Sequence, residues 1–129
     1  MLTITKIYTF EACHHLPHYV GACHSLHGHS YKLEVTVTGA QEEDMNMSHC
    51  GMIMDFKELK KIIKEVAGKY DHADLNLYFR NPTAENMVEK IALDIMCCLP
   101  NGVSLVSCKL WETADSYAEY SPLKEVFAK

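Results

Sequence analysis

Histidine is concentrated in one short part of the chain. Six of the eight histidines lie within the sixteen residues from His14 to His29. Among them, His27 and His29 flank a single glycine, so in an extended segment both imidazoles point to the same side, about 7 Å apart along the chain. They share parity with the apolar residues at 31, 33, 35 and 37, and burying two imidazoles over that face is unfavourable unless their nitrogens are satisfied. The pattern therefore predicts a metal site.

A third ligand would come from the neighbouring histidines. His14, His15, His18 and His24 are all close in sequence, and their spacing does not choose among them. Three neutral histidines with an open fourth position are typical of catalytic zinc, although copper, nickel and iron also accept imidazole. The competing interpretation is a chance His-Gly-His turn among surface histidines, which the density of the cluster disfavours.

Cys23 lies four residues before His27. A thiol beside a bound cation loses its proton more readily, and the thiolate could then act as a base or a nucleophile. Alternatively, Cys23 could be a fourth zinc ligand, which would close the site and end catalysis. The residue types alone leave both interpretations open.

Other candidates for acid–base and binding chemistry lie further along the chain. In Asp71-His72 a carboxylate could hold an imidazole in one tautomer for proton transfer, although adjacent residues need not touch. Glu112 shares strand parity with apolar residues, where a carboxylate needs a partner; a pterin or guanine edge offers two parallel N–H donors. A strand-end carboxylate turned to water is the alternative. Thr83 is expected to cap a helix, and a functional role for it stays open.

Composition excludes several classes of protein. The formal net charge is −5 and Arg80 is the only arginine, so nucleic acid is not an expected partner. No apolar run is long enough to cross a bilayer, and the first residues lack a signal core, so a cytoplasmic location is expected. The six cysteines are then expected as free thiols, with Cys97, Cys98 and Cys108 in the core.

The periodicity predicts one α+β domain over residues 1–129. Alternating or apolar segments predict strands at 2–10, 31–38, 103–113 and 116–121. Helical spacing predicts one helix from Asp55 to Gly68 and a second that follows Thr83 and ends before Pro100. The expected fold is a four-stranded antiparallel sheet with two helices on one face, in the order ββααββ.

These segments together resemble the 6-pyruvoyltetrahydropterin synthase / 6-carboxytetrahydropterin synthase family. The resemblance covers nearly the whole chain, and its motifs occur in the family's order. The matching motifs are Phe10–His14, Cys23–His29, Gly51–Phe56, Asp71–Asn76, Asn81–Asn86 and Trp111–Thr113.

The resemblance implies the tunnelling fold, in which sheets of several subunits join into a barrel. It also implies a homohexamer built from two trimers, with active sites at subunit interfaces and a small-molecule pterin as substrate. It assigns one Zn²⁺ per subunit to His14, His27 and His29.

The same resemblance distributes the catalytic and binding roles. It makes Cys23 the catalytic thiolate, with Asp71 and His72 as its partners in proton transfer. It makes Glu112 the pterin anchor, helped by Thr83.

Within the family, the short Cys-x-x-x-His-Gly-His spacing and the Trp-Glu-Thr motif resemble the branch that serves queuosine biosynthesis. The expected activity is conversion of 7,8-dihydroneopterin triphosphate to 6-carboxy-5,6,7,8-tetrahydropterin, acetaldehyde and triphosphate. The alternatives are a 6-pyruvoyltetrahydropterin synthase of the biopterin branch, a non-catalytic zinc-binding protein and a zinc hydrolase. Two departures from the family's pattern, Cys13 and His49-Cys50, could add metal contacts of their own.

Overall fold

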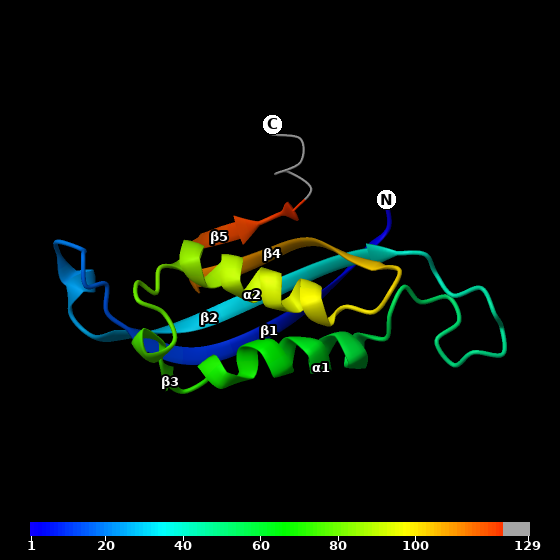
Figure 1. Ribbon diagram of the computed structural model, residues 1–129, viewed down its shortest axis with the longest axis horizontal. Coiled ribbons are helices and arrows are strands. Elements are labelled where there is room, and N and C mark those ends of the chain that lie inside the picture. The colour runs from blue at the N-terminus through cyan, green and yellow to red at the C-terminus, as the bar shows by residue number, and fades with distance from the viewer. Residues whose placement is uncertain (123–129) are drawn as a thin grey trace.

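The computed structural model describes residues 1–122, which form one sheet with two helices on one of its faces (Figure 1). The sheet has the strand order β3-β1-β2-β4-β5. Its strands are β1 (Thr3–His14), β2 (His27–Gly39), β3 (Ala73–Asp74), β4 (Val103–Thr113) and β5 (Ser116–Tyr120). The α+β class and the element order are as predicted, except for β3.

The expectation of four antiparallel strands is wrong in one respect, because β3 adds a fifth strand. β3 pairs parallel with β1, Ala73 lying opposite Ala12. With only two residues it carries no periodic pattern that could reveal it in the sequence. It fixes the segment that follows Asp71-His72 to the edge of the sheet.

The helices begin where the capping residues predict. Asp55 accepts a hydrogen bond from the backbone N–H of Lys57 (2.8 Å) before α1 (Phe56–Ala67). Thr83 accepts one from the backbone N–H of Asn86 (3.1 Å) before α2 (Ala84–Cys98). Neither helix meets the length and hydropathy needed to cross a bilayer, within the residues described.

The core lies between the sheet and the helices. The alternating side chains of β2 from Tyr31 to Val37 are buried, as is Cys108 of β4. The prediction that Cys97 and Cys98 pack in the core is wrong, since both are exposed. Both cysteines lie in the last turn of α2, beyond Ile95, which is the last buried residue of this helix. Their apolar character was therefore not sufficient to predict burial.

A β-bulge in β4 changes which residues face the core. Thr36 pairs with Ser107 and Val37 with Leu105, which leaves Val106 as the extra residue. Leu105 is therefore buried in place of Val106, against the simple alternation. Beyond the bulge Glu112 keeps the parity of the buried Leu110 and comes to the helix-covered face of the sheet.

Candidate metal centre and the adjoining cleft

Three imidazoles converge where β1 ends and β2 begins. The pairing of the two strands places His14 opposite His27, with His29 two residues further along β2. One ring nitrogen from each of the three histidines lies within 4.8 Å of the other two. The Nε2 atoms of His14 and His27 are 3.1 Å apart. These histidines are the three that the resemblance assigns to zinc, and antiparallel pairing brings them together.

Backbone carbonyls hold two of the rings from behind. His14 Nδ1 donates to the Pro82 carbonyl (2.9 Å) and lies 3.2 Å from the Tyr31 hydroxyl. His27 Nδ1 donates to the Ser25 carbonyl (2.7 Å). A neutral imidazole that donates from Nδ1 presents a lone pair at Nε2, so two lone pairs face one another across the centre. Such a pair is unfavourable unless a cation lies between them.

Burial favours the neutral, ligating form of His14 and His29. Burial lowers the pKa of His14 and of His29, against the opposing effect of the negative charge on Glu112. The Nε2 atom of His29 is buried and has no hydrogen-bond partner among the described residues. Three converging imidazoles, one with a nitrogen that has no hydrogen-bond partner among the described residues, therefore fit a divalent ion such as zinc.

Cys23 lies in the loop that joins β1 to β2, within the single turn Ala22–His24. Its carbonyl accepts a hydrogen bond from the N–H of Leu16 (2.8 Å), which folds the loop back on itself. The sulfur is partly buried and does not belong to the group of converging ligand atoms, which in residues 1–122 comprises three histidines. The sulfur is therefore not placed as a fourth ligand of the three-histidine group.

Asp71 and His72 form an ion pair, with Asp71 Oδ1 2.9 Å from His72 Nδ1. The carboxylate also accepts from the backbone N–H of Glu11 (3.0 Å), and His72 adopts a left-handed φ of 58°. Its side chain is 80% exposed and lines a shallow hollow with Glu11 and Ser30, on the face of the sheet away from the helices. Within one subunit, this dyad and the histidine cluster therefore lie on opposite faces of the sheet.

Glu112 and Thr83 line a cleft of about 680 Å³ beside the histidine cluster. Glu112 Oε1 is 3.8 Å from His29 Nε2, which brings the carboxylate next to the centre. Leu16 and Tyr19, from the loop that carries Cys23, form another part of the wall, so Glu112 and Thr83 are the two predicted site residues that line the cleft directly. Thr83 Oγ1 already accepts the hydrogen bond that caps α2.

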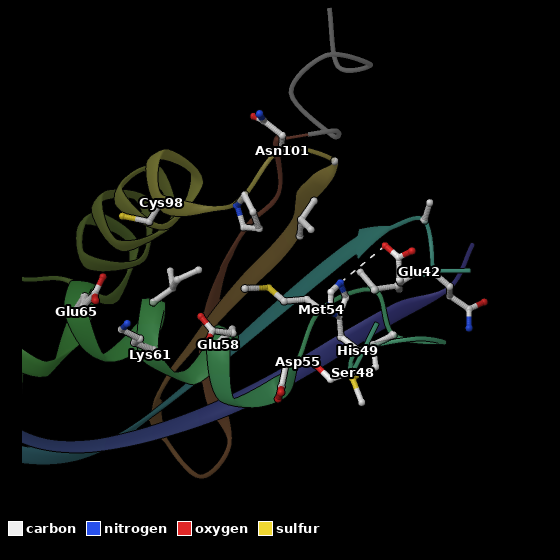
Figure 2. A pocket seen from close by; sticks show the side chains of 18 residues that line it. Glu42, Ser48, His49, Met54, Asp55, Glu58, Lys61, Glu65, Cys98 and Asn101 are labelled. Atoms are coloured by element: carbon white, nitrogen blue, oxygen red, sulfur yellow. Dashed lines mark ion pairs between the residues drawn. The ribbon is translucent and has the colours of Figure 1, made fainter. Parts of the chain in front are cut away.

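A larger cavity, of about 860 Å³, lies between the ends of the helices and the loop before α1 (Figure 2). It contains His49 and Glu42 but none of the three clustered histidines. The loops of the two cavities project from opposite ends of the sheet (Figure 1), so this cavity is separate from the histidine site.

The residue types and their spacing did not predict the groups that accept hydrogen bonds from the histidine rings. The carbonyls of Pro82 and Ser25 have no signature in the sequence, because any residue could supply them. Tyr31 did carry a signal, since it follows His27 and His29 in the same strand parity. Tyr19 in the cleft wall had none.

Strand order and the placement of both helices on one face of the sheet define the fold class without reference to function. The structure resembles that of Caenorhabditis elegans 6-pyruvoyl tetrahydropterin synthase, with a TM-score of 0.77 and 24% identity, over 93% of this chain and 94% of the other. That likeness identifies the fold as the tunnelling fold.

Sequence similarity then identifies the family. The family model described as 6-pyruvoyl tetrahydropterin synthase matches residues 3–123, so the chain belongs to this family. A 6-carboxy-5,6,7,8-tetrahydropterin synthase of Synechocystis is 38% identical over 93% of each chain. A dihydroneopterin monophosphate aldolase of Pyrococcus furiosus is 36% identical over 81% of this chain and 83% of its own.

Proposed function

We propose that this protein is a zinc-dependent 6-carboxy-5,6,7,8-tetrahydropterin synthase that acts on 7,8-dihydroneopterin triphosphate in the cytoplasm. The observation that carries the proposal is the convergence of His14, His27 and His29 beside Glu112. The cluster supplies a metal site with an open side, and the adjacent carboxylate supplies a partner for a pterin. The identity of 38% to the Synechocystis synthase supports the carboxy product.

Each side chain of the site has its own role in the proposed reaction. Zinc held by the three histidines would supply Lewis-acid chemistry toward the hydroxyls of the substrate side chain. Glu112 accepts the two parallel N–H groups of the pterin edge and orients the side chain toward the histidines. Cys23 removes a carbon-bound proton next to the ring, and His72, held by Asp71, moves a second proton. The ring is reduced as the side chain is oxidised and cleaved, and one water molecule supplies the second oxygen of the new carboxylate, so no external hydride is required.

A homohexamer would resolve the separation of the dyad from the cluster. Because His72 lies on the opposite face of the sheet and is largely exposed, it is available to a neighbouring subunit. We expect the Asp71–His72 pair of one subunit to serve Cys23 of another, in an active site at the interface of a dimer of trimers. Among the described residues β3 and β5 are the edge strands of the sheet, and we expect edge strands to form the contacts between subunits in such a barrel.

Glu112 provides the test of pterin binding. Its change to glutamine removes the charge but keeps the shape, and we expect the affinity for 7,8-dihydroneopterin to fall by roughly 10- to 100-fold, the value of a charge-assisted hydrogen bond. Fluorescence titration of the zinc-loaded protein measures it. Glu89→Gln, in the wall of the same cleft, is the matched control and should bind as the unaltered protein does.

Two results of this titration would contradict the proposal. An unaltered protein that binds no pterin would favour the non-catalytic zinc protein or the hydrolase. Equal pterin affinity in the Glu112 and Glu89 variants would remove Glu112 as the anchor and leave the cleft without an assigned ligand.

A retro-aldol activity is the second candidate, favoured by the 36% identity to the Pyrococcus furiosus aldolase. Deprotonation of a side-chain hydroxyl followed by carbon–carbon cleavage would release 6-hydroxymethyl-7,8-dihydropterin without reducing the ring. The histidine cluster and Glu112 would serve this reaction as well as the synthase reaction. The pyruvoyl product of the biopterin branch is the remaining alternative, so product identity decides among the three.

A further inference from the structure

Sulfur is concentrated in the loop before α1, at the opposite end of the molecule from the histidine cluster. Four of the seven methionines lie between residues 45 and 54, together with Cys50. Methionine is usually buried, yet Met45 is 86% exposed, Met47 44% and Met52 42%. The fold therefore leaves three thioethers and a thiol on one loop, where they add little to the core.

Two of these sulfurs lie in direct contact. The Sγ atom of Cys50 is 3.6 Å from the Sδ atom of Met45. At a metal–sulfur bond length of about 2.3 Å, two sulfurs at this separation subtend roughly 100° at a shared ion, close to the tetrahedral angle. The separation of the two sulfurs is thus compatible with bonds from both to one ion.

The backbone of the loop holds this pair in place. The N–H of Cys50 donates to the carbonyl of Met47 (3.1 Å), and the N–H of Gly51 donates to that of Glu42 (2.7 Å). Gly51 has a φ of 82°, a conformation that favours glycine and turns the chain immediately after Cys50. The two sulfurs therefore meet in a hydrogen-bonded turn.

The ligand chemistry selects a soft ion. Thiolate and thioether together favour Cu(I), whereas hard cations prefer oxygen ligands. The acidic residues 42–44 precede Met45 and attract a cation to the loop. The imidazole of His49 is engaged elsewhere, with its Nε2 3.8 Å from Glu42 Oε2, and both side chains line the larger cavity (Figure 2).

We propose that Cys50 and Met45 form a second metal site, selective for Cu(I) and separate from the three-histidine centre. Binding converts the Cys50 thiol to a thiolate and releases one proton to solvent, with no change in oxidation state. The exposed Met47 thioether, in the same turn, is available as a further sulfur ligand. The site does not depend on the activity proposed above.

The test is an anaerobic titration of the zinc-loaded protein with Cu(I) in competition with bicinchoninate, with released zinc measured in parallel. The unaltered protein should withhold one equivalent of Cu(I) and keep its zinc. Loss of one arm of a two-sulfur chelate should lower that affinity on the order of 10²-fold, so Met45→Leu and Cys50→Ser should each show this drop. Met96→Leu and Cys98→Ser, which change exposed sulfurs of α2, are the matched controls.

Three outcomes would overturn the proposal. These are failure of the unaltered protein to withhold Cu(I), release of zinc in step with copper uptake, and unchanged affinity in either loop variant. Unchanged affinity in either loop variant would show that a single sulfur or a different site binds the copper. Thermal melting of the copper-free variants controls for folding, and Met45→Leu should melt as the unaltered protein does because its side chain lies almost wholly in solvent.

Discussion

Alanine in place of Cys23 is expected to abolish turnover while leaving the zinc content near one ion per subunit. Cys23 lies on the loop beside the cleft, and its sulfur is not among the converging ligand atoms. Loss of a positioned acid–base group lowers turnover by about 10²- to 10⁴-fold, and we expect the upper part of that range because Cys23 removes the first proton in the proposed mechanism. Zinc content by mass spectrometry and turnover of the same sample measure both effects.

Cys98→Ala is the control for this variant, because Cys98 is an exposed cysteine outside the predicted site. It should keep both zinc and turnover. If Cys23→Ala instead loses zinc with its activity, the thiol is a ligand and the site is closed. If it keeps full turnover, the base must be another group.

His27→Ala is expected to remove zinc from the protein. Its ring faces His14 across 3.1 Å and is held by the Ser25 carbonyl, so its loss leaves two ligands and an unsupported centre. Mutation of a residue that hydrogen-bonds to a metal ligand lowers metal affinity by about 10- to 100-fold. Loss of a ligand itself should lower the zinc affinity by more than this. Competition with a zinc-binding dye measures the change.

His24→Ala is the matched control, since His24 belongs to the same dense run of histidines but not to the converging group. It should bind zinc as the unaltered protein does. Equal zinc affinity in the His27 and His24 variants would contradict the three-histidine centre.

Local patterns predicted the parts of the site that lie within one element. The parity of His27 and His29 with the apolar residues of β2 follows from strand geometry, and the caps Asp55 and Thr83 follow from side-chain chemistry. The choice of the third histidine did not follow from either. It depends on the register that pairs His14 with His27, a contact between two strands that the spacing alone does not fix.

Features that depend on long-range contacts escaped prediction. The parallel pairing of β3 carries the Asp71–His72 dyad to the outer face of the sheet, and nothing in that dipeptide indicates which face it occupies. The bulge at Val106 exchanges the faces of the first part of β4 but leaves Glu112 on the face that its parity with Leu110 indicated. Both depend on how strands meet, which residue periodicity within one strand does not encode.

Product identification tests the central claim most directly. The zinc-loaded protein would be incubated with 7,8-dihydroneopterin triphosphate and the products separated and weighed by mass spectrometry. The account predicts 6-carboxy-5,6,7,8-tetrahydropterin together with acetaldehyde and triphosphate. 6-Hydroxymethyl-7,8-dihydropterin or 6-pyruvoyltetrahydropterin in its place would contradict the proposed reaction while keeping a pterin site, and unchanged substrate would contradict the function itself.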